Sequence, residues 1–168
     1  GDFATVEVAG VPILVVRQED GGIRAFANLC RHRGARVVED ACGNARSFRC
    51  PYHGWTYGFD GRLRAIPEKS AFSGIDPAGR ALVPLPAEER HGFLWVVASP
   101  SGTIDVAAHL GALDAELTAF GLDAYVEERS VWLRDGLHWK LVVDGFLEAY
   151  HLPVLHPETA GALIHGRP

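Results

Sequence analysis

Methionine is absent from the 168-residue sequence, and only three cysteines occur in it. Three thiols cannot build a disulfide framework. The longest apolar stretches, such as residues 93–98, have the length of a strand and are far shorter than the roughly 20 residues of a membrane-spanning helix. No charged and then apolar leader opens the chain. Because the sequence begins at Gly1, we expect both ends to have been trimmed.

Positive charge is also scarce. The formal net charge is −5, and no run of lysine or arginine stands out. This balance argues against a nucleic-acid partner and against an anchor on an anionic membrane. Apolar residues make up 48% and charged residues 22%, as in an ordinary globular protein. Cys42 is an unpaired small thiol of the core or of a loop, and a reducing cytoplasm suits it best.

The first part of the chain, residues 1–100, has the pattern of short segments and turns that is typical of a small all-β module. Short apolar or alternating segments are separated by glycine turns, and Asp60-Gly61 predicts a hairpin. Several short strands of this kind favour a sandwich or a barrel. The expected strands include residues 12–16, 23–26, 55–57, 63–65 and 93–97.

The pattern changes in residues 101–168. Apolar residues recur at helical spacing over 104–120, and Gly121 follows as a stop. Residues 125–133 alternate as a strand, and residues 137–150 read as a helix that Pro153 ends. We therefore predict an α+β fold, with an all-β domain over 1–100 and the start of an α+β domain over 101–168.

Two short segments each combine cysteine with histidine. Cys30 and His32 are separated by seventeen residues from the second pair, Cys50 and His53. Two thiolates and two imidazoles suit either zinc or an iron–sulfur cluster, and the spacing alone leaves both open.

The flanking residues favour the cluster. The segments NLCRHRGA (residues 28–35) and CPYHGWTY (residues 50–57) closely resemble the two cluster-binding loops of Rieske proteins. The resemblance implies a [2Fe–2S] cluster with two thiolates on one iron and two imidazoles on the other. A glycine after each histidine-bearing turn lets the backbone approach the cluster.

The loops differ from the respiratory-complex type of Rieske protein. That type carries a second cysteine in each loop and a serine after the second His-Gly, where this chain has Trp55. Fewer hydrogen bonds to sulfur predict a reduction potential toward the low end of the Rieske range. Such a centre suits the delivery of electrons to an oxygen-activating site.

A second constellation lies near the end of the chain. Glu148 and His151 are three residues apart, so on one helix they would share a face. His156 follows after Pro153, which redirects the chain. Two imidazoles with an open side are what a facial 2-His-1-carboxylate iron site needs.

With the cluster motif upstream, this segment looks like the large (α) subunit of Rieske non-haem iron oxygenases. The resemblance covers essentially the whole chain and implies a helix-grip-like catalytic domain after the Rieske domain. It implies that His151 and His156 bind a mononuclear Fe(II), and that Glu148 is the electron-transfer bridge to the cluster of a neighbouring subunit. The partner of this bridge would be His53 or His32, and His53 matches the family's partner better. Asp144 is a candidate second-shell acceptor for a ligand histidine.

The resemblance also implies partners and a substrate class. Electrons would come from NAD(P)H through a reductase or ferredoxin, O₂ and a small organic molecule would be the substrates, and the assembly would be a homotrimer. Many relatives have Asp at position 148, whereas Glu is commoner in those that resemble quaternary-ammonium oxygenases. The family's third iron ligand, an aspartate, lies far beyond Pro168, so we expect this chain to be a fragment.

A second hypothesis is a Rieske ferredoxin that only carries electrons. Ferredoxins of this kind usually end near residue 99, and residues 101–168 would then be an unrelated extension. The ordered histidine pair in that extension argues against this alternative.

Overall fold

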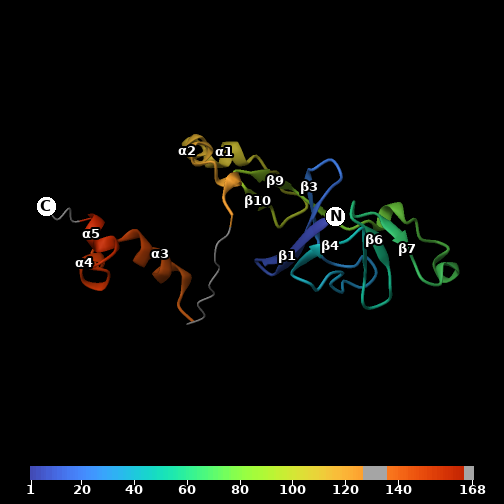
Figure 1. Cartoon of the computed structure of the whole chain (residues 1–168). Helices are drawn as coiled ribbons and strands as arrows, with labels where there is room; N and C mark the ends of the chain where they lie inside the picture. The colour runs from blue at the N-terminus through green and yellow to red at the C-terminus, as the bar shows by residue number, and fades with distance from the viewer. Residues whose placement is uncertain (127–135, 165–168) are drawn as a thin grey trace. The chain divides into compact units, whose positions relative to one another are not determined.

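A computed structural model describes residues 1–126 and 136–164 of the chain (Figure 1). Its internal contacts divide the chain into two compact units, Gly1–Tyr125 and Val126–Pro168. The first unit is sheet-rich and the second contains short helices, as an α+β chain requires. Most of the strand expected over residues 125–133 lies outside the described residues.

A five-stranded antiparallel sheet forms the base of the first unit. Its central strands come from the alternating and apolar segments near the N-terminus, where β-branched residues favour extended backbone. The strand order is β4 (Cys42–Asn44), β1 (Asp2–Val8), β2 (Val11–Arg17), β3 (Ile23–Ala27) and β8 (Pro84–Leu85). The apolar run predicted as a strand is therefore β2, which pairs with β1 and β3.

Two smaller antiparallel sheets complete the β-structure of this unit. The three-stranded sheet contains β5 (Ser47–Arg49), β6 (Thr56–Gly58) and β7 (Leu63–Ala65), and the two-stranded sheet contains β9 (Ala87–Arg90) and β10 (Phe93–Val96). The hairpin predicted at Asp60-Gly61 is confirmed, because β6 and β7 pair across it and Gly61 has a φ of 81°. The closing strand is confirmed as β10.

Strand β2 is buried on both faces, so it separates two hydrophobic cores. Leu14 and Val16 belong to the larger core, which also contains both motif cysteines. Ile13 and Val15 point to a smaller core shared with Leu85. Side chains alternate across a strand, which explains why consecutive apolar residues serve different cores. The cysteines are thus anchored in the larger core.

The helical segment predicted over residues 104–120 is two helices, α1 (Val106–Leu110) and α2 (Ala112–Phe120). Gly111 separates them with a φ of 56° and a ψ of −124°, which is not helical. Gly121 ends α2 in the left-handed conformation, as predicted. Short 3-10 turns occur at η1 (Lys69–Phe72), η2 (Ala78–Arg80) and η3 (Leu122–Ala124).

Ionic contacts hold α1 and α2 beside the β9–β10 hairpin (Figure 1). Asp114 accepts hydrogen bonds from Arg90 Nε at 2.5 Å and Arg90 Nη2 at 2.6 Å, and its Oδ1 lies 2.7 Å from His91 Nε2. The Glu88 carboxylate accepts the backbone N–H of Val106 at 3.0 Å. Residues 101–125 therefore pack with the β-module.

The second unit contains α3 (Trp139–Leu147), α4 (Leu152–Leu155) and α5 (Ala160–Ile164). The helix predicted over residues 137–150 is shorter at both ends. At its start, the His138 Nδ1 accepts the backbone N–H of Lys140 at 3.2 Å. Within the described residues, no helix has the length and apolar character needed to cross a membrane.

Candidate metal centres

The first motif loop is closed by two backbone hydrogen bonds. The Cys30 N–H donates to the Ala35 carbonyl at 2.8 Å, and the Gly34 N–H donates to the Cys30 carbonyl at 2.8 Å. Gly34 has a φ of 74°, a left-handed conformation that suits glycine. The loop therefore turns sharply at Gly34, two residues after His32.

The second loop repeats this scheme. The Cys50 N–H donates to the Trp55 carbonyl at 2.8 Å, and the Gly54 N–H donates to the Cys50 carbonyl at 3.0 Å. Gly54 has a φ of 71°. The two loops thus present their cysteines with matching backbone geometry, although they differ by one residue between cysteine and histidine.

The two loops bring the four predicted ligand side chains together. Cys30 and Cys50 are 4% and 2% exposed, and the ring centroids of His32 and His53 are 4.7 Å apart. The Nδ1 atom of His32 is buried and has no hydrogen-bond partner among the described residues. An orphaned buried nitrogen is costly unless something binds it. Two thiols and two imidazoles in this arrangement fit a [2Fe–2S] cluster.

The environment favours the metal-binding form of His32 but opposes that of Cys50 until a metal charge is present. Burial lowers the pKa of His32, and the nearby His53 and Arg33 lower it further. A lower pKa keeps the imidazole neutral, as a ligand nitrogen must be. Burial is also the main reason that the pKa of the Cys50 thiol is raised, with a smaller contribution from Cys30. Without a metal charge, the buried Cys50 thiol is held in the protonated form.

Aromatic rings enclose His32 but leave His53 open. The Trp55 ring stacks on the His32 ring at 5.0 Å with an interplanar angle of 6°, and Phe72 packs edge-on at 5.8 Å. Trp55 is itself 1% exposed. His53 contacts Tyr52 and is exposed. The outer side of His53 is therefore the more accessible of the two.

Tyr57 is a functional residue that sequence reasoning missed. Its hydroxyl oxygen accepts the Arg31 backbone N–H at 2.9 Å and lies 3.3 Å from Cys30 Sγ. Because the oxygen accepts from Arg31, the hydroxyl proton is free to donate to the sulfur. Burial raises the pKa of Tyr57. The only sequence signal was its place four residues after His53.

Asn28 connects the start of the first loop to the residues that follow it. Its side-chain oxygen accepts the backbone N–H groups of Val37 and Val38 at 3.1 and 3.0 Å, and its Nδ2 donates to the Val38 carbonyl at 2.7 Å. Asn28 is 1% exposed, so these bonds form away from water. The asparagine therefore stabilises the loop that carries Cys30 by hydrogen bonds to its far end.

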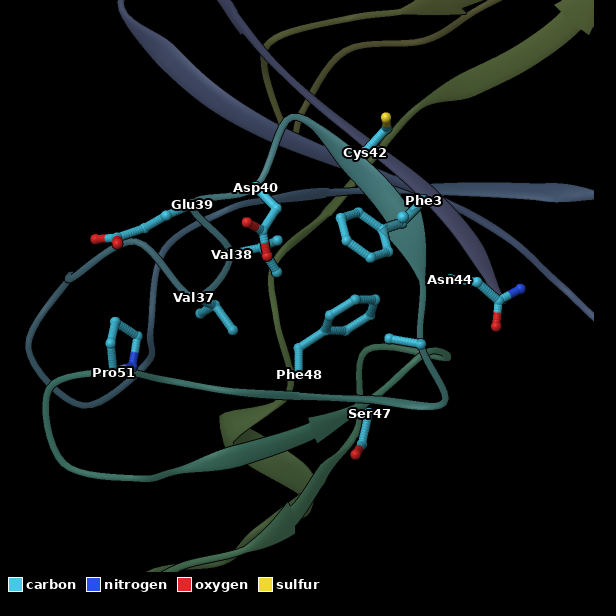
Figure 2. Close-up of a pocket in the computed structure, with 12 residues that line it drawn as sticks. Phe3, Val37, Val38, Glu39, Asp40, Cys42, Asn44, Ser47, Phe48 and Pro51 are labelled. Atoms are coloured by element: carbon cyan, nitrogen blue, oxygen red, sulfur yellow. The ribbon is translucent and has the colours of Figure 1, made fainter.

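A shallow hollow of about 460 Å³ lies beside the two loops (Figure 2). Its lining includes Glu39 and Asp40 beyond the first loop and Pro51 in the second. Figure 2 shows the rings of Phe3 and Phe48 close together at its centre, and their centroids are 5.4 Å apart. We assign this hollow a packing role.

The thiol left over by the motif lies on the rim of that hollow. Cys42 is a free and exposed thiol on β4. Its side chain points away from the two phenylalanine rings (Figure 2). The expected place in the core or in a loop is therefore wrong, because Cys42 is exposed on a strand. The short β4 lies at the edge of its sheet, so the side chain of Cys42 stays in contact with solvent.

The second unit has a largely apolar pocket of about 730 Å³. Glu148, His151 and His156 all line it, and the ring centroids of the two histidines are 5.7 Å apart. The structure therefore brings this predicted trio together. The remaining lining residues are Leu137, Leu141, Val142, Gly145, Phe146, Leu152, Thr159 and Ala160.

Glu148 and His151 are paired, but not in the way the sequence predicted. The helix α3 ends at Leu147, and Glu148 is extended with a ψ of 147°, so the two residues do not share a helix. The Glu148 carboxylate instead accepts the backbone N–H of Tyr150 at 2.6 Å and of His151 at 3.3 Å. These N–H groups would otherwise continue α3, so the carboxylate competes with the helix.

The same carboxylate also contacts the Nδ1 atom of His151. This hydrogen bond is the main reason that the pKa of Glu148 lies below its usual range, and the Tyr150 N–H adds to it. Pro153 does not end a helix, because it occupies the first turn of α4, where its missing N–H costs nothing.

Asp144 lies on α3 and is exposed, and it does not line the pocket. Its assignment as a second-shell acceptor stays a prediction. Within the described residues, no three His, Cys, Asp or Glu side chains converge closely enough to hold a single metal ion. A [2Fe–2S] cluster asks for only two side chains at each iron.

Comparison with known families identifies the class of this protein. The Rieske [2Fe-2S] domain family matches residues 1–86, and the ring hydroxylating alpha subunit (catalytic domain) family matches residues 122–167. The chain therefore belongs to the Rieske [2Fe-2S] family, and its later residues match the catalytic domain of ring hydroxylating alpha subunits. This membership favours a [2Fe–2S] cluster over zinc, and Rieske oxygenases also use mononuclear iron and NAD(P)H through a reductase.

Among curated relatives, the glycine betaine monooxygenase oxygenase subunit of Chromohalobacter salexigens is 36% identical over 165 residues, covering 98% of this chain and 36% of the relative. The carnitine monooxygenase oxygenase subunit of Escherichia coli (strain K12) is 33% identical over 162 residues, covering 93% of this chain and 42% of the relative. This chain thus spans well under half the length of these relatives.

Solved structures of Rieske oxygenases are also similar to this chain over most of its length. The quaternary ammonium Rieske monooxygenase CntA in complex with L-carnitine is 30% identical, with a TM-score of 0.80 over 93% of this chain and 45% of that chain. Naphthalene 1,2-dioxygenase from Rhodococcus sp., bound to indole, is 31% identical, with a TM-score of 0.77 over 94% of this chain and 37% of that chain.

Proposed function

We propose that this chain is the N-terminal part of the terminal oxygenase component of a Rieske non-haem iron oxygenase system. With electrons from NAD(P)H through a reductase or ferredoxin, the whole protein would use O₂ to hydroxylate or dealkylate a small organic substrate. The observation that carries the proposal is the order of two sites along one chain. The histidine-lined pocket follows the paired Cys–His loops, and each lies in the matching family domain.

In this proposal Cys30 and Cys50 hold one iron of the cluster, and His32 and His53 hold the other. His151 and His156 hold the mononuclear iron. When bound, the cluster transfers single electrons and the mononuclear iron activates O₂. The chain's own residues prepare both sites, since the loops present the neutral imidazole of His32 beside His53 and two buried thiols, and the pocket offers an apolar wall.

Glu148 has a linking role in this scheme. Its carboxylate already accepts a hydrogen bond from His151, and a carboxylate has lone pairs left for a second donor. The exposed outer side of His53 in a neighbouring copy would be that donor, as in a homotrimer. Glu148 would then be the inter-subunit bridge, and Asp144 would act only through the ligand histidines.

The apolar pocket supports a small organic substrate, aromatic or of the quaternary-ammonium type. The named relatives act on glycine betaine and carnitine, and with the glutamate at position 148 they favour a quaternary-ammonium substrate here. We propose a functional division into residues 1–100 and 101–168, in which residues 101–125 begin the second domain in sequence although they pack with the β-module. We also propose a cytoplasmic location, because the exposed free thiol of Cys42 suits a reducing compartment.

Iron analysis of the full-length protein tests the proposal against the electron-carrier alternative. Three irons per chain, together with the electron paramagnetic resonance signal of a reduced Rieske cluster, are expected. Two irons per chain with the same signal would support a carrier. The match of residues 122–167 to a catalytic domain disfavours that alternative, because an unrelated extension would not match.

A further inference from the structure

The short helix α4 has the two proposed iron ligands at its ends. His151 is its N-cap residue and His156 is its C-cap residue, so the position of each imidazole depends on where α4 lies. The helix itself spans only Leu152–Leu155. A helix of a single turn is far shorter than the roughly 12–15 residues that make an isolated helix even marginally stable. Contacts from outside α4 therefore have to hold it in place.

The helix α5 supplies such a contact. The backbone N–H of Gly161 donates to the His156 carbonyl at 2.9 Å, and the N–H of Thr159 donates to the same oxygen at 3.2 Å. On its other side, the His156 N–H donates to the Leu152 carbonyl at 2.9 Å. The backbone of His156 is thus held between α4 and the start of α5.

The absence of a side chain at Gly161 allows α5 to come this close. A Cβ atom on Gly161 would lie 2.6 Å from the Leu152 carbonyl oxygen and 2.8 Å from the His156 carbonyl oxygen. Both distances are too short for a methyl group beside an oxygen. Both oxygens belong to the backbone, so they cannot rotate away as a side chain could. A larger residue at the buried position 161 would therefore push α5 away from α4.

Backbone conformation does not explain this glycine. Gly161 lies within α5, and its φ is not in the left-handed region that favours glycine. Inside a helix, glycine is less favourable than alanine. The close approach to the two carbonyl groups is therefore the physical reason for glycine at this position.

Gly145 shows that this close approach is specific to Gly161. Gly145 also lies in a helix of the second unit, α3. Among the described residues, a Cβ atom on Gly145 would meet no heavy atom of another element within 4 Å. An added methyl group is therefore accommodated on α3 but not on α5.

We infer that Gly161 is a positioning residue for the mononuclear iron site. By letting the α5 backbone lie against both ends of α4, it sets the spacing of the His151 and His156 imidazoles, whose ring centroids are 5.7 Å apart. This inference rests on the proposed role of the two histidines as ligands. Gly161 has no side chain to offer the metal, so it acts entirely through the placement of α4.

The test uses the full-length protein with its cluster loaded and its mononuclear iron removed by a chelator. Anaerobic equilibrium dialysis against Fe(II), with the bound iron measured per chain, gives the affinity of the mononuclear site. For Gly161→Ala we expect this affinity to fall about 10–100-fold, the usual effect of losing the support of a metal ligand. The cluster content should stay at the wild-type level, because both cluster loops lie in the other unit.

Saturation with Fe(II) separates positioning from unfolding. At Fe(II) concentrations well above the weakened dissociation constant, Gly161→Ala should regain the iron content of the wild type. Nitric oxide bound to the ferrous site then serves as a spectroscopic probe. Its electron paramagnetic resonance spectrum should differ from that of the wild type, because the spectrum depends on the arrangement of the ligand nitrogens.

Two control variants add atoms elsewhere in the second unit. Gly145→Ala makes the same substitution where space is free, and Ala162→Ser adds a hydroxyl group at the exposed residue next to Gly161. Both should keep the wild-type Fe(II) affinity and the wild-type spectrum of the nitric oxide complex. The comparison concerns metal binding rather than turnover, because Gly145 also lines the pocket.

Other outcomes would overturn the inference. An unchanged Fe(II) affinity and spectrum in Gly161→Ala would remove the positioning role while leaving the oxygenase proposal intact. Equal losses of affinity in Gly161→Ala and in both controls would show that the site at Gly161 is not special. A Gly161→Ala protein that no concentration of Fe(II) saturates would assign the glycine a purely structural role. A wild-type protein that binds no iron beyond the cluster would overturn the proposed function itself.

Discussion

At the residue scale, the hydroxyl of Tyr57 would tune the chemistry of a cluster bound by the two loops, because it contacts one of the ligand sulfurs. It lies 3.3 Å from Cys30 Sγ and is held there by the Arg31 N–H. Hydrogen bonds to the sulfur ligands stabilise the more negative, reduced cluster and raise its potential. The expectation of a potential near the low end of the range was based on residues missing from the loops, so it did not include this contact.

We predict that Tyr57→Phe lowers the reduction potential of the cluster by about 60 mV, which for one electron is a tenfold change in the equilibrium constant. The phenylalanine ring keeps the packing of a side chain that is 0% exposed. A redox titration followed by electron paramagnetic resonance measures the shift. Thr56→Val is a neighbouring control, since the Thr56 hydroxyl donates to the Gly54 carbonyl rather than to a sulfur. An unchanged potential in Tyr57→Phe would contradict the assignment.

Site residues that are close together in the sequence could be predicted, whereas contacts between residues far apart in the sequence could not. The four cluster residues lie in two contiguous segments, so their pattern was legible in the sequence, although their ligand roles stay predictions. Tyr57 contacts Cys30 across 27 residues, and no local pattern encodes such a contact. The stack of Trp55 on His32 was hidden for the same reason, because it joins the two loops only after they fold.

At the element scale, a carboxylate on α2 holds the two helices of the first unit to the β9–β10 hairpin. The hydrogen bonds from Arg90, and then from His91, hold the pKa of Asp114 well below its usual range. A carboxyl group whose folded pKa is depressed stabilises the fold above its unfolded pKa, about 3.9 for aspartate. That stability is lost as the pH falls below this value.

We predict that Asp114→Asn lowers the melting temperature at pH 7 by a few degrees. The difference from the wild type should shrink as the pH falls below about 4, because the wild-type carboxylate then takes up a proton in the unfolded state. Differential scanning calorimetry from pH 7 to pH 3 follows this difference. Glu116→Gln on the same helix is the control and should show no such dependence. A constant difference across this range would contradict the ion-pair explanation.

The helix boundaries illustrate what local patterns do not determine. Apolar periodicity carried the predicted helix through to residue 150, but α3 ends at Leu147. A side-chain oxygen of Glu148 satisfies the next backbone N–H groups, and glutamate in this role has no strong sequence signature. The turn still brings His151 and His156 to one pocket. The predicted grouping of the two histidines is therefore confirmed, although the predicted helix through residue 150 was wrong.

At the scale of the whole molecule, the proposed bridge makes the assembly part of the site. We predict that Glu148→Gln in the full-length protein leaves the iron content nearly unchanged. It should slow electron transfer from the reduced cluster to the mononuclear iron by about 10–100-fold, as loss of an outer-shell partner typically does. Single-turnover kinetics of cluster reoxidation in the presence of substrate and O₂ measures this rate.

Glu148→Asp is the matched control, because it keeps the carboxylate that many relatives carry and should retain most of the rate. Analytical ultracentrifugation of each variant confirms that the oligomer is intact. Transfer in Glu148→Gln at the wild-type rate would refute the bridge. A parallel loss of mononuclear iron would instead indicate that the carboxylate mainly orients His151, to which it is hydrogen-bonded.

Because β2 is buried on both faces, substitutions at neighbouring positions of this strand affect different hydrophobic cores. Even-numbered positions such as Leu14 and Val16 face the core that contains the cysteines, and the odd-numbered Ile13 and Val15 face the other core. A large-to-small substitution at an even-numbered position therefore affects the core around the cysteines. The same substitution at the next, odd-numbered position affects the core beside the β9–β10 hairpin. Within residues 13–16 of β2, the parity of the residue number therefore decides whether a substitution reaches the core that contains Cys30 and Cys50.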